Sequence, residues 1–233
     1  MLLALTCAAD LHRATRGLFD PTIRESLERA GYDRSFEGVE AGADRLNARE
    51  PGAAAPGLNC VEIDVDAARV RLPRGVRVDL GGLGKGLAAD LVSRGLVDRG
   101  ARTALVSLGG DMRARGDAPE GAWRIPVEDP LDESRLAFVY DLNDEALVSS
   151  TRRIRSWTRG ERQYHHIIDP RTGDPASSPV VAVVAAAPDA WWAEGIAKAI
   201  MIGDLVDAPA LAASARVRAW VFVDDGQVIE VGP

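Results

Sequence analysis

The chain has 233 residues, of which 46% are hydrophobic and 27% are charged, and its formal net charge at pH 7 is −7. This composition is typical of a soluble globular protein with one large domain or two small ones that share a sheet. The acidic balance argues against nucleic-acid binding, which would show as a basic stripe, and no apolar run approaches the roughly 18–20 residues of a membrane span.

The N-terminal quarter of the chain is predicted to contain two helices and a loop. Glycine and proline punctuation places the helices at residues 2–16 and 21–30. Residues 38–57 are rich in Gly, Ala, Pro and charge, and we expect a surface loop there. Cys7 and Cys60 have no CxxC spacing and no nearby His, so we expect free thiols rather than a zinc site or a disulfide framework.

Strands follow, and one of them leads into a glycine-rich turn. Alternating apolar residues predict a hairpin of residues 61–65 and 68–72 and a further strand at 76–80. The sequence Gly-Gly-Leu-Gly-Lys-Gly occupies residues 81–86, and a helix is predicted over 87–97. Glycine allows close approach to the backbone, and free amides at a helix start favour a phosphate or another anion. The spacing matches neither a P-loop nor GxGxxG, so this turn alone is weak evidence.

A second strand with a Gly-Gly end comes next. The predicted strand at 104–108 runs into Gly109, Gly110 and Asp111. Two such strand ends can form one crevice, in which Asp111 would accept hydrogen bonds from a ligand. The alternative is a pair of tight turns in a sheet.

The remainder of the chain is predicted to be mainly strands. They are expected at 123–127, 136–140, 146–149, 180–187, 217–223 and 228–231, the last two as a terminal hairpin. One more helix is predicted between Asp189, a typical N-cap residue, and Gly203. Lysine occurs only as Lys85 and Lys198. A compositional bias that removes surface lysine leaves the lysines that a site requires, so both are candidates.

The segment Tyr164–Gly173 reads Tyr-His-His-Ile-Ile-Asp-Pro-Arg-Thr-Gly and holds two of the chain's three histidines. A His beside a rigid turn can take or give protons near neutral pH, while backbone amides and Arg171 hold an anion. The alternative is a strand-end turn with a structural His whose hydrogen bonds are satisfied. Together with the two glycine turns, the segment favours a functional site.

Three blocks occur in a definite order along the chain. They are Asp-Leu-Gly-Gly-Leu-Gly-Lys-Gly at 79–86, Ser-Leu-Gly-Gly-Asp at 107–111 and His-Ile-Ile-Asp-Pro-Arg-Thr-Gly at 166–173. In this order they resemble the signature blocks of the FAD:protein FMN transferases, the ApbE-type flavin transferases. Residues 17–22, which end in Phe-Asp-Pro-Thr, are similar to the family's block near the flavin. The resemblance extends from about residue 2 to the C-terminus.

The resemblance implies a fold, an activity and a cofactor. The expected fold is α+β, with mixed sheets, packed helices and a central nucleotide cleft, and residues 1–233 would form a single domain. The expected reaction moves FMN from FAD onto a Thr or Ser hydroxyl of an acceptor protein and releases AMP. FAD and a divalent ion, usually Mg²⁺, would bind in the cleft. Such phosphoryl transfer needs positioning and charge neutralisation more than covalent help.

The resemblance also assigns roles by position. His166 is the expected base for the incoming hydroxyl, with Lys85 as the second catalytic group, and His165 is expected to pack beside them. The expected cofactor-binding residues are Phe19, Asp20, Thr22, Asp79, Gly81, Gly82, Lys85, Gly109, Gly110, Asp111, Asp169 and Thr172. The expected metal positions are Gly84, Glu194 and Lys198, where Lys198 marks a position only, because an ammonium group is not a metal ligand.

The sequence departs from the family pattern in three places. The family's additional N-terminal segment, which contacts FAD, has no counterpart in the chain as given. A Thr-Ser-Gly-Asp-like block reads Ser-Ser-Thr-Arg at 149–152. The helix that usually supplies an Asp and, four residues later, a Thr or Ser to the metal carries Glu194 and Lys198. These two form either an intrahelical ion pair worth about 0.3–0.5 kcal/mol or a fixed charge, with Lys198 in place of the metal.

Three functions are therefore weighed for the chain. The first is a flavin transferase that acts on a protein hydroxyl. The second is a flavin-nucleotide binding protein without transferase activity, and the third is an FAD pyrophosphatase in which water replaces the hydroxyl. The intact block around His166 favours an enzyme. The chain as given is expected to be cytoplasmic, or exported if its true start lies upstream.

Overall fold

The computed structural model describes residues 1–34, 36, 39, 52–159 and 162–233. Its centre is a six-stranded sheet with the strand order β12-β11-β10-β7-β4-β3, in which all neighbouring pairs are antiparallel. The strands are β3 (Ala104–Leu108), β4 (Asp111–Arg115), β7 (Ala146–Thr151), β10 (Val180–Ala187), β11 (Arg218–Val223) and β12 (Val228–Val231). The fold is therefore α+β, as the resemblance implied.

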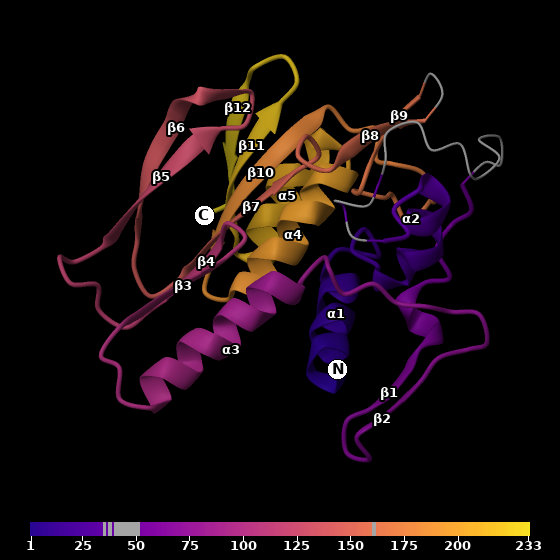
Figure 1. Ribbon diagram of the computed structural model, residues 1–233, viewed down its shortest axis with the longest axis horizontal. Helices are drawn as coiled ribbons and strands as arrows, with labels where there is room; N and C mark the ends of the chain where they lie inside the picture. The colour runs from indigo at the N-terminus through magenta and orange to yellow at the C-terminus, as the bar shows by residue number, and fades with distance from the viewer. Residues whose placement is uncertain (35, 37–38, 40–51, 160–161) are drawn as a thin grey trace.

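Helices cover one face of this sheet (Figure 1). Helix α4 (Ala190–Ile202) lies against β10 and β7, and α3 (Gly84–Asp98) lies against β3 and β4. Helix α5 (Ala208–Ala215) contacts α4, and α1 (Leu2–Ala14) packs on α4 from outside. Gly195 in α4 allows α1 to pack this closely, because a Cβ atom at residue 195 would collide with the side chain of Leu11 in α1.

A hairpin of β5 (Trp123–Asp129) and β6 (Asp132–Leu142) covers the opposite face of the sheet. Its aromatic rings pack on Trp220 of β11, whose centroid lies 4.7 Å from that of Phe138 and 5.3 Å from that of Tyr140. Strand β10 is consequently covered on both faces, and all eight of its residues are buried. This explains why its sequence is continuously apolar rather than alternating.

Smaller elements lie beside the main sheet. Hairpins are formed by β1 (Glu62–Asp64) with β2 (Arg69–Arg71) and by β8 (Ser156–Arg159) with β9 (Arg162–His165). Helix α2 (Arg24–Ala30) follows a short 3₁₀ turn, Pro21–Ile23, and two further 3₁₀ turns occur at Leu58–Cys60 and Leu205–Asp207. Both cysteines are free thiols, as expected.

Most predicted helices and strands are confirmed, but the strand at 76–80 is wrong. This segment belongs to no ladder, and the N–H of Asp79 donates instead to the carbonyl of Pro21 at 2.7 Å. Its apolar side chains pack on the core without a partner strand. Of the predicted loop at 38–57, residues 38 and 40–51 lie outside the described residues, and residues 52–57 have no regular structure.

Four elements carry no prediction from sequence: β4, β8, β9 and α5. In β4, Asp111 and Arg113 are buried because each is in an ion pair. Charged residues at buried positions conceal the alternation that identifies a strand. Helix α5 is mainly alanine, so its sequence shows little contrast between a buried and an exposed face.

The N-terminus of α4 is capped from another helix. Asp189 occupies the predicted N-cap position, but its side chain makes no capping hydrogen bond. Asp90 of α3 accepts the N–H groups of Ala190 at 3.1 Å and Trp191 at 3.0 Å instead. The predicted N-cap position of Asp189 is therefore confirmed, but the capping hydrogen bonds come from Asp90, a carboxylate distant in sequence.

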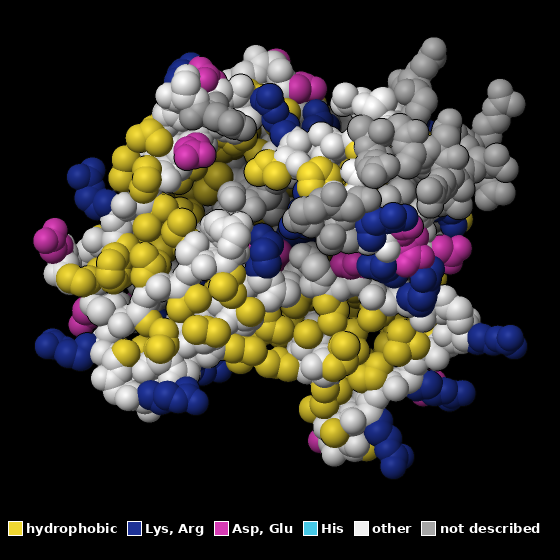
Figure 2. All heavy atoms as spheres, viewed as in Figure 1, with side chains coloured by type: hydrophobic (Ala, Val, Ile, Leu, Met, Phe, Trp, Pro, Cys, Tyr) yellow, Lys and Arg dark blue, Asp and Glu magenta, His cyan; other side chains and the backbone are white. Residues whose placement is uncertain are grey.

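The surface of the described part carries exposed apolar side chains. Figure 2 shows them over α3 and α1, where Leu91, Val92, Leu96 and Leu3 are exposed. Among the helices of the described ranges, none combines the length and apolar composition needed to cross a membrane.

Candidate active site

A cavity of about 380 Å³ lies where the loop before α2, the start of α3, the end of β7 and helix α4 converge. This volume is within the range of small-molecule sites. Nine residues predicted from sequence line it: Phe19, Asp20, Asp79, Gly81, Gly82, Lys85, Gly109, His166 and Lys198. The two glycine turns therefore border one cavity, as expected, although no strand precedes the first of them.

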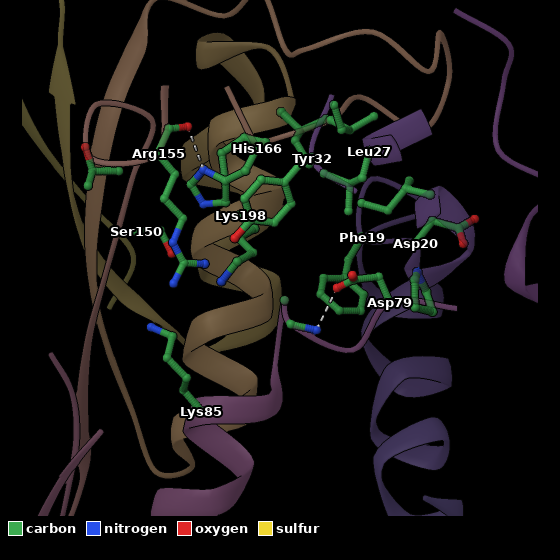
Figure 3. A pocket seen from close by; sticks show the side chains of 18 of the residues that line it. Phe19, Asp20, Leu27, Tyr32, Asp79, Lys85, Ser150, Arg155, His166 and Lys198 are labelled. Carbon is green, nitrogen blue, oxygen red and sulfur yellow. Dashed lines mark hydrogen bonds between the residues drawn. The ribbon is translucent and has the colours of Figure 1, made fainter. Parts of the chain in front are cut away.

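The cavity has an apolar end and a polar end (Figure 3). Phe19 and Leu27 lie at the apolar end, where Asp20 and Asp79 also line the cavity, and His166, Lys198 and Lys85 are grouped at the polar end, with the ring of Tyr32 between the two groups. A molecule that fits both ends must join an apolar part to an anionic part.

Sequence reasoning missed much of the lining. The additional residues include Ile23, Leu27, Tyr32, Ser150, Ile154, Arg155 and Ile168. The i,i+4 spacing of Ile23 and Leu27 was a usable signal for a shared apolar face. Nothing in the sequence pattern singles out Arg155, which comes from the loop after β7.

Lys85 reaches the cavity in contact with a buried carboxylate. Its Nζ donates to Oδ2 of Asp111 at 2.5 Å, and the other oxygen of Asp111 accepts the N–H of Ser149 at 3.2 Å. Asp111 is fully buried and is not part of the lining. Burial raises the pKa of Asp111 and nearby Glu194 raises it further, whereas Lys85 and Lys198 lower it. The sequence suggested that Asp111 faces a ligand. In the structure it contacts and positions Lys85 instead.

Lys198 has a similar partner in its own helix. Its Nζ donates to Oε1 of Glu194 at 3.0 Å, and Oε2 of Glu194 accepts the N–H of Gly86 at 2.9 Å. Glu194 is fully buried, so the predicted ion pair exists but is anchored in the core. A Cβ atom at Gly86 would lie 2.5 Å from the Ala190 carbonyl, and glycine therefore allows α3 to approach α4 this closely.

His166 follows β9 and points into the polar end (Figure 3). Its Nδ1 lies 3.4 Å from the carbonyl oxygen of Arg155. A carbonyl only accepts, so Nδ1 carries the proton and Nε2 keeps its lone pair. Burial, followed by the positive charges of Lys198 and Arg155, lowers the pKa of His166 to about 3. The imidazole is therefore neutral near pH 7 and its Nε2 is free to accept a proton, but the lowered pKa makes it a weaker base than an exposed histidine.

His165 lies outside the cavity lining, as its predicted packing role requires. Its Nε2 contacts the carbonyl oxygen of Ala176 at 3.1 Å. Burial lowers the pKa of His165, so this histidine is also held neutral.

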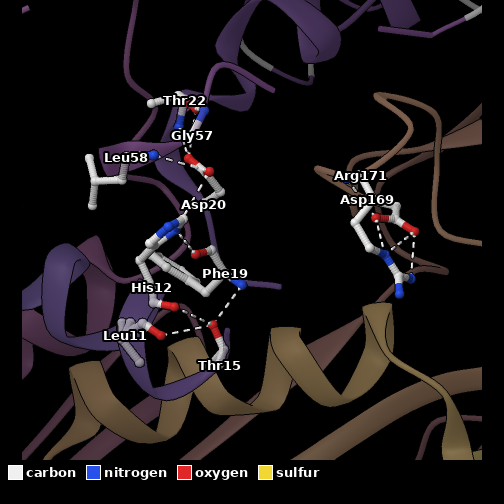
Figure 4. A network of polar contacts seen from close by, with 10 residues as sticks. All are labelled: Leu11, His12, Thr15, Phe19, Asp20, Thr22, Gly57, Leu58, Asp169 and Arg171. Carbon is white, nitrogen blue, oxygen red and sulfur yellow. Dashed lines mark hydrogen bonds and ion pairs between the residues drawn. The ribbon is translucent and has the colours of Figure 1, made fainter. Parts of the chain in front are cut away.

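The Asp-Pro-Arg-Thr-Gly turn shapes the site without lining it. Asp169 accepts hydrogen bonds from the guanidinium of Arg171, at 2.7 Å for the shortest (Figure 4). Arg171 also donates to the Ile202 carbonyl at 3.3 Å. Arg171, which was expected to help hold an anion, pairs with Asp169 and lies outside the cavity lining. Asp169 and Thr172, both predicted to bind cofactor, lie outside the lining.

A second polar network fixes the segment before α2 (Figure 4). Asp20 Oδ1 accepts the N–H and the hydroxyl of Thr22 at 2.8 and 2.7 Å, and its Oδ2 accepts the N–H of Leu58 at 3.2 Å. The Thr22 hydroxyl accepts the N–H of Gly57 at 3.0 Å. Thr22 lies outside the lining, so its contacts serve the loop that presents Phe19 to the cavity.

The residues do not fit a divalent metal ion at the predicted position. Gly84 and Glu194 lie outside the cavity lining, as does Gly110. Mg²⁺ requires several oxygen ligands in octahedral geometry, and the oxygens of Glu194 already accept hydrogen bonds from Lys198 and Gly86. Within the described ranges, no three His, Cys, Asp or Glu side chains gather as a metal-binding group.

Comparison with known proteins gives one consistent result. Residues 1–221 match the profile of the ApbE family. A FAD:protein FMN transferase of Rhodobacter capsulatus is 31% identical over 220 residues, which are 94% of this chain and 42% of that protein. A protein of the same name from Vibrio cholerae is 28% identical over 94% of this chain and 66% of its own length. The chain thus spans less than two thirds of these relatives.

Solved structures agree with the sequence matches. The crystal structure of the ApbE protein from Thermotoga maritima superposes with a TM-score of 0.82 at 26% identity, covering 99% of this chain and 75% of that one. The flavin transferase ApbE from Vibrio cholerae gives a TM-score of 0.80 at 27% identity, with 99% and 74% of the two chains covered.

Proposed function

This chain belongs to the ApbE family, and we propose that it transfers FMN from FAD to a Thr or Ser hydroxyl of an acceptor protein and releases AMP. The observation that carries the proposal is the position of His166. A neutral imidazole with a free Nε2 lines the same end of the cavity as Lys85 and Lys198. A base and two cations at one end of a nucleotide-sized cavity suit phosphoryl transfer.

The proposed division of the cavity follows its two ends. The flavin ring lies at the apolar end, against Tyr32, Leu27 and Phe19, where aromatic and aliphatic side chains bury a planar ring. The pyrophosphate lies at the polar end, near Lys85 and Lys198. Gly109 borders this end beside Lys85, and Gly82 lies between Phe19 and Lys198. Neither has a side chain that would occupy the space for the phosphate oxygens.

The proposed reaction is one displacement at phosphorus. Nε2 of His166 takes the proton of the acceptor hydroxyl while its oxygen attacks the phosphorus of the FMN half of FAD. A phosphoester bond forms, and the bond from this phosphorus to the bridging oxygen of the pyrophosphate breaks. AMP leaves with that oxygen, and Lys85 and Lys198 stabilise the negative charge that develops. The proton on His166 then passes to solvent.

Magnesium, which the family resemblance implied, has no step in this proposal. Lys85 and Lys198 bring two positive charges to the polar end, and the oxygens of Glu194 are already engaged. The acceptor is proposed only as a protein with an accessible Thr or Ser.

Product analysis tests the proposal. The purified chain is incubated with FAD and with an acceptor protein prepared without its covalent FMN, and the products are separated. Covalent flavin on the acceptor together with AMP supports the transferase. Free FMN with AMP identifies an FAD pyrophosphatase, and bound FAD without AMP identifies a flavin-nucleotide binding protein. Either of these two outcomes contradicts the proposal.

A further inference from the structure

Two ammonium–carboxylate pairs lie at the polar end of the cavity and are connected to each other. Lys198 pairs with Glu194 in α4, and Lys85 at the start of α3 pairs with Asp111 of β4. The N–H of Gly86, next to Lys85, donates to Glu194. The two lysines are therefore held in one hydrogen-bonded unit that joins α3, α4 and β4.

In this unit the two carboxylates lie deeper in the protein than the two ammonium groups. The side chains of Glu194 and Asp111 are 0% exposed, whereas those of Lys198 and Lys85 are 15% and 38% exposed. Both lysines line the cavity and neither carboxylate does. The four formal charges sum to zero, but the cavity meets the positive groups first.

The carboxylate oxygens are already occupied. Glu194 accepts from Lys198 and Gly86 through its two oxygens, and Asp111 accepts from Lys85 and Ser149 through its own. A divalent ion at this place would have to displace an ammonium group from a buried carboxylate. Displacement of this kind leaves a charge without its partner and is costly.

Another group at the same end lacks a partner. The hydroxyl of Ser150 is buried, lines the cavity and has no hydrogen-bond partner in the described part of the chain. Ser150 is 6% exposed. A buried hydroxyl without a partner is uncommon and indicates a ligand or water that supplies one. An anionic oxygen beside Lys198 would accept its proton.

We propose that Lys85 and Lys198 form a built-in pair of ammonium groups that binds the pyrophosphate of the bound dinucleotide, so that this chain binds FAD without a divalent metal ion. The proposal rests on the proposed function and deepens it. The pyrophosphate of FAD carries two negative charges and several acceptor oxygens. Each ammonium group has three donors, of which one is given to its carboxylate and two remain for the phosphate oxygens. The chain itself therefore supplies the positively charged donors at this end of the cavity.

Calorimetric titration of the whole chain tests this inference. FAD is titrated in EDTA and again with excess Mg²⁺, and inorganic pyrophosphate is titrated in EDTA alone. We expect both ligands to bind in EDTA and Mg²⁺ to change the Kd of FAD by less than about twofold. Binding of FAD that requires Mg²⁺ would overturn the inference and leave the proposed function intact.

The variant Lys198→Thr gives the sharpest contrast. It removes the ammonium group, frees Oε1 of Glu194 and places a hydroxyl one helical turn away. We expect its Kd for FAD in EDTA to rise about tenfold or more, the loss of one charged hydrogen bond, and to recover with Mg²⁺. Unchanged affinity in EDTA would contradict the inference. Lys198→Arg keeps the charge and should keep metal-independent binding even if the Thr variant folds poorly.

Arg71→Ala serves as the matched control. Arg71 lies on β2 with its side chain 79% exposed, and the substitution changes the net charge by the same amount as Lys198→Thr. Its Kd for FAD should stay within about twofold of the unmodified chain. If pyrophosphate binds in EDTA but FAD binds neither in EDTA nor with Mg²⁺, the proposed function is refuted, whereas binding of a pyrophosphate group by the two lysines without a metal ion is supported. Failure of both ligands in every condition would refute both.

Discussion

The backbone N–H of Gly86 in α3 donates to Oε2 of Glu194 in α4 at 2.9 Å. This bond lies directly behind the two lysines of the cavity, since Lys85 precedes Gly86 and Lys198 pairs with the other oxygen of Glu194. The carboxylate thus fixes the start of α3 and one lysine of the cavity together.

Removal of this carboxylate should destabilise the fold. Glu194→Ala leaves Lys198 and the Gly86 N–H without their buried partner, and we expect the free energy of unfolding to fall by about 3–5 kcal/mol. Glu194→Gln keeps an oxygen for Gly86 and should lose less. Denaturant unfolding of both variants measures the difference. Equal losses would show that charge pairing with Lys198, rather than the hydrogen bond, dominates.

Asp90 should matter more to α4 than its own N-cap residue. Asp90→Ala removes the acceptor for the Ala190 and Trp191 amides and leaves Arg113 without its buried partner. We expect a loss of about 3 kcal/mol in unfolding free energy. Asp189→Ala is the control and should cost less than about 0.5 kcal/mol. Thermal or denaturant unfolding compares the two, and a larger effect at Asp189 would contradict this account of the cap.

His166 should make the fold less stable on acidification. Its pKa in the folded chain is lowered to about 3, whereas in the unfolded chain it is near 6.5. Below pH 6.5 the unfolded chain therefore binds a proton that the folded chain refuses, and stability falls as pH decreases towards 3. His166→Asn should make this decline shallower. Unfolding measured from pH 8 to pH 4 in both proteins checks it, and identical slopes would contradict the lowered pKa.

FAD should bind more tightly than FMN. Both ligands offer the flavin ring to the apolar end, but the pyrophosphate of FAD reaches both Lys85 and Lys198. Titration followed by flavin fluorescence gives both values of Kd. Equal affinities, or no FAD binding up to about millimolar concentration, would contradict the assignment of the polar end to the pyrophosphate.

The sequence predicted the residues that line the cavity better than the residues that hold them in place. Gly82, Lys85, Gly109 and His166 belong to short motifs whose chemistry is local, and all four line the cavity. Asp169 shows the opposite case. Its motif was recognised, but its contact with Arg171 depends on how the turn closes, which residue types alone do not specify.

Long-range partners were the part that sequence could not supply. Asp111 was expected to face a ligand, yet it is fully buried behind Lys85. Arg155 lines the cavity because the loop after β7 returns to His166. The backbone N–H and the side chain of His166 both contact the carbonyl oxygen of Arg155. Periodicity describes one element at a time, whereas these contacts depend on the packing of several.

The assignment of His166 as the base is tested most directly by intact-mass analysis of an acceptor protein after incubation with FAD. The unmodified chain should add FMN to the acceptor, and His165→Gln, outside the cavity lining, should do so within a few-fold. His166→Ala should add none while its Kd for FAD stays within a few-fold, because the base acts on the incoming hydroxyl. Transfer by His166→Ala at a rate near that of the unmodified chain would contradict the account.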